Sequence, residues 1–278
     1  MDMNRSRVAS RGASWATLTL AAVLVTTAPI AQASLTAYSP AGANLVRLQN
    51  GPLDLTLTAD GNLLGNLLTS ASDPAALISS IIAASGNPTL TSGDFSNDGR
   101  TSYLGARAFI SYLNTMNYGG TNQWRLPGMT DTGTAGCNFS YSGTDCGYNV
   151  DPASSELARL YYSELGLIAK FDTDGFPNSG GGYGIFANDN NGNPTSGAVG
   201  LFSNLQSDAY WLGLDYSPGT AWIFATGDGI QGFESNQGRS YAWAVTSGLV
   251  SPVPLPAPVW LLGSGLLCLA RLRRTRQA

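Results

Sequence analysis

The chain contains no histidine, only one lysine (Lys170) and three cysteines among its 278 residues. The absence of histidine excludes Ser-His-Asp and Cys-His mechanisms, histidine general bases and most transition-metal sites. The sequence also lacks a P-loop and a G-x-S-x-G nucleophile elbow. A formal G-x-G-x-x-A match at residues 182–187 lies in a Gly- and Asn-rich loop with no buried strand before it, which argues against a dinucleotide site.

The first 33 residues have the order of a secretory signal peptide. Three arginines precede an apolar stretch at residues 15–30, and the small residues Ala31 and Ala33 then occupy the two positions that a signal peptidase reads. We therefore predict export and cleavage after Ala33. The alternative is a buried N-terminal helix, but the charges, the apolar run and the small-residue site occur in the order that export requires.

A second apolar run, at residues 257–272, lies near the C-terminus. As an α-helix it would be about 24 Å long, whereas the hydrocarbon core of a bilayer is about 30 Å thick. It therefore spans the membrane only if the bilayer thins locally or the flanking side chains snorkel to the interface. Arg271, Arg273 and Arg274 lie at its end, where the positive-inside rule places them in the cytoplasm. Both a permanent single-span anchor and a segment that is cut after insertion fit this pattern.

A proline-rich motif, Val253-Pro254-Leu255-Pro256-Ala257, stands at the start of this run. The motif, the short apolar segment and the arginine cluster at residues 252–278 together resemble the PEP-CTERM sorting signal in its VPLPA form. The resemblance implies recognition by an exosortase-type membrane protease in a Gram-negative bacterium that makes extracellular polysaccharide. It predicts an inner-membrane anchored precursor that is transferred to the cell surface or the extracellular matrix.

Removal of both ends leaves residues 34–251, enough for one domain with its own core. Three arginines and Asp2 lie before this region and four arginines lie after it, so it keeps 7 of the 14 basic and 17 of the 18 acidic residues, a formal charge of −10. A charge of that sign argues against binding of nucleic acid through a broad basic surface. It is compatible with neutral glycans or divalent cations.

Cys137 and Cys146 are the only cysteines of this exported region. Outside the cytoplasm such a pair predicts a disulfide, which in a short loop contributes about 2–3 kcal/mol. A zinc site is the alternative, but the region offers no further cysteine and no histidine as ligands.

Calcium is the one cofactor for which the sequence offers a hypothesis. Asp94 and Asp98 begin a pattern that resembles a calcium-binding loop, although Gly105 stands where a bidentate glutamate is expected. Asp172 and Asp174 offer further oxygen ligands. Each of these segments also suits a plain turn in which the aspartate side chain caps the backbone.

Hydrophobic periodicity predicts an α+β fold in a single domain, with N-terminal helices and a C-terminal antiparallel β-meander. Period-two alternation predicts a strand at residues 53–58, and capping and spacing predict helices at 74–85, at 102–116 and from Asp151-Pro152 onward. The strands expected in the meander are residues 210–214, 221–224, 230–234 and 241–245, separated by Gly- and Pro-containing turns.

The middle of the chain carries a second resemblance, from about residue 53 to residue 249. The segments that carry it are Trp124-Arg125-Leu126-Pro127, Tyr210-Trp211, and the strands that contain Trp222 and Trp243. They are similar to the Lcl C-terminal domain family, which implies a fold related to C-type lectins. Its better-known members are surface proteins implicated in adhesion to sulfated glycans, and no catalytic residues are established for it. Here Thr246 stands where the family has an arginine, which with a charge of −10 argues against sulfated glycans as ligands of this chain.

Considered by themselves, these motif residues suit a scaffold. Trp124 and Leu126 would fill the core, Pro127 would fix the turn, and Arg125 would pair with a carboxylate or cap backbone carbonyls. Tryptophans in strands are usually core residues, so Trp211, Trp222 and Trp243 would stack on sugar rings only where they are exposed.

The sequence therefore predicts an exported binding or structural protein rather than an enzyme, associated with exopolysaccharide or another glycan. The alternative is an enzyme that acts on polysaccharide with carboxylates alone, which needs two carboxylates about 5–9 Å apart across a groove. A matrix component without a discrete ligand is a third possibility. The expected partners are the exosortase-type protease, a glycan, and the membrane before processing.

Overall fold

The computed structural model describes residues 34–50, 53–132, 141, 144–178, 182–187 and 196–250. Its helices and strands are β1 (Ser34–Tyr38), β2 (Leu45–Asn50), β3 (Leu53–Thr58), α1 (Leu63–Ser70), α2 (Pro74–Ser85), α3 (Tyr103–Thr115), α4 (Glu156–Ala158), the π-helix η4 (Arg159–Glu164), β4 (Ser196–Val199), β5 (Phe202–Gln206), β6 (Ala209–Ser217), β7 (Thr220–Ala225), β8 (Ile230–Ser235) and β9 (Val245–Ser247). The predicted cleavage site at Ala31 and Ala33, Cys137 and the predicted sorting segment 252–278 lie outside the described residues. Within the described ranges, no helix combines the length and the apolar character needed to cross a bilayer.

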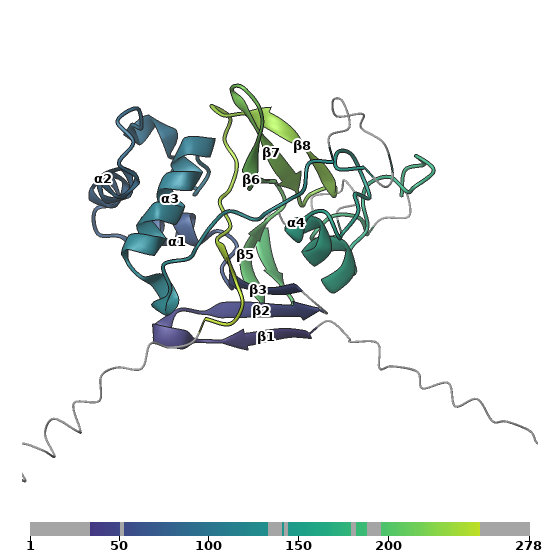
Figure 1. The fold of residues 1–278 in the computed structure, drawn as a ribbon, viewed down its shortest axis with the longest axis horizontal. Helices are drawn as coiled ribbons and strands as arrows, with labels where there is room; N and C mark the ends of the chain where they lie inside the picture. The colour runs from purple at the N-terminus through teal and green to yellow at the C-terminus, as the bar shows by residue number, and fades with distance from the viewer. Residues whose placement is uncertain are drawn as a thin grey trace, which may run out of the picture. The chain divides into compact units, whose positions relative to one another are not determined.

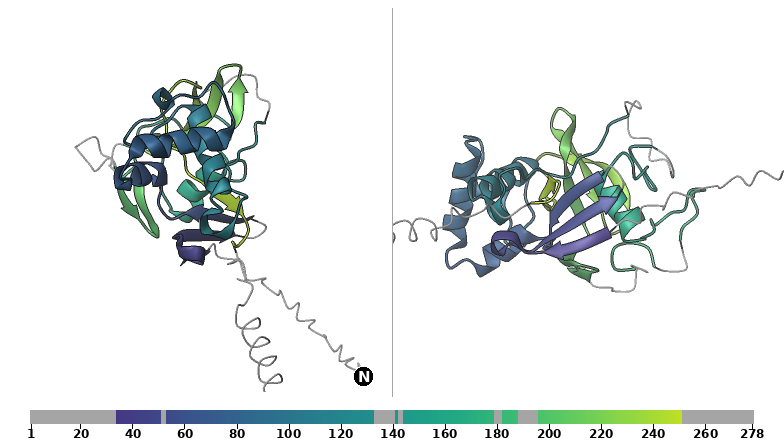
Figure 2. Two further views of the ribbon diagram at one scale, coloured as in Figure 1. Left: turned by 90° about the vertical axis from the view of Figure 1, so that its left-hand side faces the viewer. Right: turned by 60° about the horizontal axis from the view of Figure 1, so that its bottom comes forward.

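Helices and antiparallel sheets share the fold, which confirms the α+β class (Figure 1). One sheet has the strand order β1-β2-β3-β9, a second has the order β6-β7-β8, and β4 and β5 form a separate pair. The right-hand view of Figure 2 shows the β1-β2-β3 face. Three strands precede the first helix, whereas the sequence predicted one strand before the N-terminal helices. Periodicity over residues 53–58 showed only the third of these strands.

The β6-β7-β8 sheet is covered on both faces. Side chains of successive strand residues point to opposite faces, and β6 and β7 are apolar at nearly every position through their middle. Trp211 and Ile223 pack into a cluster with α1, α2 and α3, whereas Trp222 and Phe224 pack into a second cluster with β2, β3, α4 and η4. Figure 1 shows α1, α2 and α3 on one side of the sheet, α4 on the other side, and β2 and β3 below it. The sheet therefore separates two apolar clusters.

All four tryptophans of the exported region are core residues, as predicted. Their exposed fractions are 3% for Trp124, 0% for Trp211, 1% for Trp222 and 1% for Trp243. The indole N–H of Trp211 donates to the carbonyl of Thr101 at 2.8 Å, and that of Trp243 donates to the carbonyl of Thr58 at 2.9 Å. These rings are closed to a sugar in this fold, so a glycan would have to be recognised by other side chains.

Two of the three predicted helices form where their capping residues indicated. Asp73 caps α2 by accepting the N–H of Ala76 at 3.0 Å, and Gly86 ends it in the left-handed conformation. Ser102 caps α3 by accepting the N–H of Gly105 at 3.1 Å. Both caps satisfy backbone groups that a helix end leaves unpaired.

The third helix begins later than predicted. The side chain of Asp151 accepts the N–H of Ala153 at 2.9 Å and its carbonyl accepts the N–H of Ser154, so residues 151–154 form a turn instead of a first helical turn. Helix α4 starts at Glu156, after a cap by Ser155, and continues into the π-helix η4. The competing turn is the physical reason for the shift.

The last predicted strand does not close the meander. Residues 241–244 run beside β6 with one parallel bridge, Tyr210 to Tyr241, and the chain then enters the other sheet as β9. The N–H of Trp211 donates to the carbonyl of Tyr241 at 2.9 Å, and the N–H of Thr58 donates to that of Ala244 at 3.1 Å. This segment thus satisfies the free edge of β6 and ties the two sheets together.

Candidate functional site

The Trp124-Arg125 turn is held by backbone contacts on both sides. The side-chain amide of Asn114 accepts the N–H of Trp124 at 2.7 Å and donates to its carbonyl at 2.9 Å. Arg125 exchanges two backbone hydrogen bonds with Val245, of 2.8 and 2.9 Å. The turn is therefore fixed between α3 and β9, and the Arg125 side chain starts from a rigid base.

Arg125 forms a forked ion pair with Glu156. Its Nη1 and Nη2 atoms donate to Oε2 and Oε1 of Glu156, each at 2.7 Å, and the N–H of Gly128 donates to Oε2 at 2.6 Å. Nη1 also donates to the carbonyl of Leu126 at 3.2 Å. The prediction that Arg125 pairs with a carboxylate or caps a carbonyl is confirmed in both parts. Sequence reasoning did not identify Glu156 as the partner.

Two depressions meet at this ion pair. The first, of about 570 Å³, lies between α3, β6 and the Trp-Arg turn. The second, of about 500 Å³, lies between residues 128–130 and residues 152–159. Gly128 and Glu156 line both of them, so we treat the two depressions as one surface, the ion-pair groove.

Basic side chains gather in the ion-pair groove although the exported region is acidic. Arg107, Arg125 and Arg159 line it, three of the seven basic residues between positions 34 and 251. The Arg107 guanidinium lies 5.9 Å from the centre of the Tyr103 ring, and Nε of Arg159 lies 3.6 Å from Oε1 of Glu164. Guanidinium groups are donors only, so the groove offers hydrogen-bond donors to oxygen-rich ligands.

Two carboxylates, Glu156 and Asp215, line the groove, and Glu156 is engaged through both of its oxygens. Both oxygens of Glu156 are hydrogen-bonded to Arg125, and one of them also accepts the N–H of Gly128. A glycosidase of the ordinary type needs one carboxyl group that can donate a proton and a second one free to act as base or nucleophile. The contacts of Glu156 suit neither role.

Three of the four candidate calcium ligands, Asp94, Asp98 and Asp172, use their carboxylates in local hydrogen bonds. Asp94 accepts the hydroxyl of Ser102 at 2.7 Å and the N–H of Thr91 at 2.9 Å, and Asp98 accepts the N–H and Nε of Arg100 at 3.1 and 2.9 Å. In the second segment, Asp172 accepts the N–H groups of Asp174 and Phe176 at 3.0 and 2.8 Å. No group of three or more Asp, Glu, Cys or His residues suited to a metal occurs in the described part of the chain. The aspartates act here as cap and turn residues.

The remaining family-motif residues lie apart from the groove. Tyr210 is buried, and its hydroxyl accepts the N–H of Gln206 at 2.8 Å, while Trp222 and Trp243 pack in the second core cluster. Pro127 adjoins the groove through its carbonyl, which accepts the N–H of Gly213 at 2.8 Å. Cys146 is buried and disulfide-bonded. Of the predicted motif, the structure therefore brings only the Trp-Arg-Leu turn to this surface.

Comparison of the chain with models of protein families, with curated proteins and with solved structures finds no match. The ion-pair groove, the burial of the tryptophans and the motifs of the sequence are therefore the observations from which a function can be proposed.

Proposed function

We propose that the protein is an exported cell-surface or extracellular-matrix protein that binds exopolysaccharide or another glycan and is sorted by an exosortase-type system. The resemblance of residues 252–278 to a PEP-CTERM signal supports the sorting, and the order of residues 1–33 supports export. Similarity to the Lcl C-terminal domain family, with a C-type-lectin-like arrangement, belongs to the same proposal.

The open ion-pair groove is the observation that carries the binding role. A glycan chain is extended and rich in hydroxyl oxygens, and the groove presents Arg107 beside the ring of Tyr103 in one depression and Arg159 in the other. The apolar part of its lining, including Ile110 and Leu214, can contact the less polar face of a sugar ring. Arg125 and Glu156 compensate each other, so the middle of the groove is polar without a net charge.

Retention on the producer's own exopolysaccharide tests this role. The protein used is the fragment of residues 34–251, which remains after the predicted signal peptide and sorting segment are removed. We expect saturable retention of this fragment on the immobilised polysaccharide. Absence of retention, with and without calcium, would contradict a glycan-binding role and favour a protein partner or a passive place in the matrix.

A pair of serine variants locates the binding surface. Ser111 lines the groove and its hydroxyl donates to the carbonyl four residues earlier in α3, at 3.1 Å. Ser80 makes the same contact in α2, at 2.9 Å, and does not line the groove. We expect Ser111→Trp to fill the groove and reduce retention at least tenfold, and Ser80→Trp to bind as the unmodified fragment does. Equal retention of the two variants would exclude the groove as the site.

Sorting is tested on the full chain in the producing cell. We expect replacement of Pro254 and Pro256 by alanine to leave an uncut precursor in the membrane fraction. Replacement of Arg271, Arg273 and Arg274 should impair the retention of the precursor before transfer. Normal appearance of the proline variant at the surface would show that the motif is not recognised.

A further inference from the structure

A small polar pocket lies on a different part of the surface from the ion-pair groove. It has a volume of about 200 Å³ and shares no lining residue with the groove. Five amide side chains line it, from the start of α1, the loop before Arg100, and β5: Asn62, Asn66, Asn97, Asn204 and Gln206. We name it the amide pocket.

One carboxylate holds the amide pocket together. Oδ2 of Asp60 accepts the side-chain N–H groups of Asn66 and Asn204, each at 3.0 Å, and Oδ1 accepts the backbone N–H of Asn62 at 2.9 Å. A parallel backbone bridge between Asp60 and Ser203 brings β5 to this point. Asp60 thus orients amides from two elements, the farther of which is 144 residues away in the chain.

The backbone around the pocket is constrained in a way that few side chains tolerate. Asn204 has a φ of +51°, in the left-handed region. Gly99 has a φ of +92°, and a Cβ atom there would lie 2.0 Å from Oδ1 of Asn62. Strain of this kind is often found at binding sites, because the surrounding contacts maintain it.

Several polar atoms of the pocket remain available to a ligand. Nδ2 of Asn204 and Nε2 of Gln206 are used internally, but Oδ1 of Asn204, Oε1 of Gln206 and the whole amide of Asn97 have no partner among the residues that the structure describes. An amide group offers both donors and acceptors, which matches a hydroxyl group that does the same.

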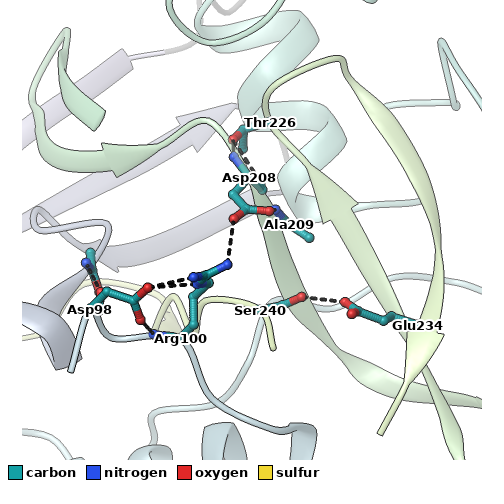
Figure 3. Close-up of polar contacts among 8 residues, drawn as sticks. Asp98, Arg100, Asp208, Ala209, Thr226, Glu234 and Ser240 are labelled. Atoms are coloured by element: carbon teal, nitrogen blue, oxygen red, sulfur yellow. Dashed lines mark hydrogen bonds and ion pairs between the residues drawn. The ribbon is translucent and has the colours of Figure 1, made fainter. Parts of the chain in front are cut away.

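The charges at the rim are balanced. Arg100 lies between Asp98 and Asp208, with Nη2 2.9 Å from Oδ2 of Asp98 and Nη1 3.8 Å from Oδ2 of Asp208 (Figure 3). The Asp60 carboxylate does not line the pocket and accepts hydrogen bonds from two of the amides that do. Asp98 is the one carboxylate in the lining, and Arg100 pairs with it, so the other polar side chains that a ligand meets are neutral amides and the hydroxyl of Thr69. A single paired carboxylate supplies fewer ligands than calcium requires.

We infer that the amide pocket binds one neutral sugar ring through its hydroxyl groups, without calcium. The inference adds a second, chemically distinct contact for a glycan beside the ion-pair groove. Because the pocket is tested with small glycosides, its failure and that of polysaccharide retention through the groove can be told apart.

Ligand-observed NMR on the fragment 34–251 tests the inference with methyl glycosides of glucose, galactose and mannose, and with glucuronic acid as the acidic comparison. We expect at least one neutral glycoside to bind with a dissociation constant of about 1 mM, as suits a few hydrogen bonds, and calcium to leave it unchanged. Binding of none of the neutral glycosides, preference for glucuronic acid, or strict dependence on calcium overturns the inference.

Two asparagine-to-glycine variants supply the matched control. Asn204 and Asn117 both have a φ near +50°, and glycine relieves that strain at either position, so both variants should fold. Only Asn204 lines the pocket. We expect Asn204→Gly to weaken binding of the neutral glycoside about tenfold, the loss expected from one or two hydrogen bonds, and Asn117→Gly to leave it unchanged. Equal affinity of the two variants overturns the assignment even if a glycoside binds elsewhere.

Discussion

Arg125 and Glu156 are joined by two parallel hydrogen bonds, each 2.7 Å long, between a turn after α3 and the first residue of α4. The pair links segments 31 residues apart and lies where the two halves of the ion-pair groove meet. It therefore contributes both to the stability of the domain and to the shape of its candidate binding surface.

Arg125→Ala should lower the melting temperature, because Glu156 keeps only the N–H of Gly128 as a partner. The Arg125 side chain is 39% exposed, so solvent screens the interaction and we expect a cost of about 1–2 kcal/mol. A double-mutant cycle with Glu156→Gln, followed by urea denaturation, measures the coupling directly. The forked pair Arg47–Asp54 is the comparison, and Arg47→Ala should lower the melting temperature less, because Asp54 is 34% exposed whereas Glu156 is 18% exposed. An unchanged melting temperature for Arg125→Ala would refute the structural role.

Gly99→Ala should be strongly destabilising. A Cβ atom at position 99 would lie 2.0 Å from Oδ1 of Asn62 and 2.7 Å from the backbone N of Gly65, in addition to the strain of a φ of +92°. Gly86→Ala is the matched control, because Gly86 also has a positive φ but an added Cβ meets nothing within 4 Å. We expect about 1 kcal/mol for Gly86→Ala and at least about 2 kcal/mol for Gly99→Ala in thermal denaturation. Similar costs would show that the loop gives way at Gly99.

Asp228→Asn should stabilise the protein at neutral pH but not in acid. Burial raises the pKa of Asp228, and the N–H of Ile230, the charge of Lys170 and the hydroxyl of Tyr148 oppose this only in part. The folded state therefore binds more protons than the unfolded state between the unfolded pKa of about 3.9 and the folded pKa, so stability falls as pH rises through that window. The amide keeps the acceptor for Ile230 and removes this penalty. Urea midpoints of both proteins across that window check the prediction, and a pH-independent difference would contradict it.

A carboxylate whose pKa is lowered in the folded state changes the stability with pH in the opposite direction to Asp228. Partial burial raises the pKa of Asp94, but hydrogen bonds from Ser102 and Thr91 outweigh it and leave the pKa below its usual value. The stability from this group is present above the unfolded pKa and is lost as pH falls through the folded one. The difference between Asp228→Asn and the unmodified protein isolates Asp228, since Asp94 is common to both.

Fluorescence of the fragment 34–251 should respond little to acrylamide and little to a bound glycan. Its four tryptophans are at most 3% exposed, so a quencher reaches them only when the fold opens. Titration with acrylamide in buffer and in urea measures this contrast. Strong quenching in buffer would show that at least one tryptophan is exposed to solvent. A large shift in emission on glycan binding would place at least one tryptophan at the ligand.

Local signals in the sequence were enough for part of the fold. The cap at Asp73 and the glycine at position 86 marked α2, because a helix end must satisfy its own backbone groups within a few residues. The spacing of apolar residues marked α3. Apolar strand residues marked β3 and β6 to β8, and the tryptophans were correctly placed in the core. The absence of histidine by itself limited the chemistry open to the side chains.

Only the tertiary structure decided which segments meet. Residues 241–245 have the pattern of a meander strand, yet they run beside β6 and continue into the other sheet, since strand pattern specifies burial but not the partner. Arg125 and Glu156 pair across 31 residues of the chain. Asp60 binds Asn204 across 144 residues, and it also binds Asn66, which is only 6 residues away. The sequence by itself determined the ends of α2 and α3, the burial of the tryptophans and the terminal signals on which the export prediction rests. The groove and the amide pocket arise from packing between distant segments, which no local pattern encodes.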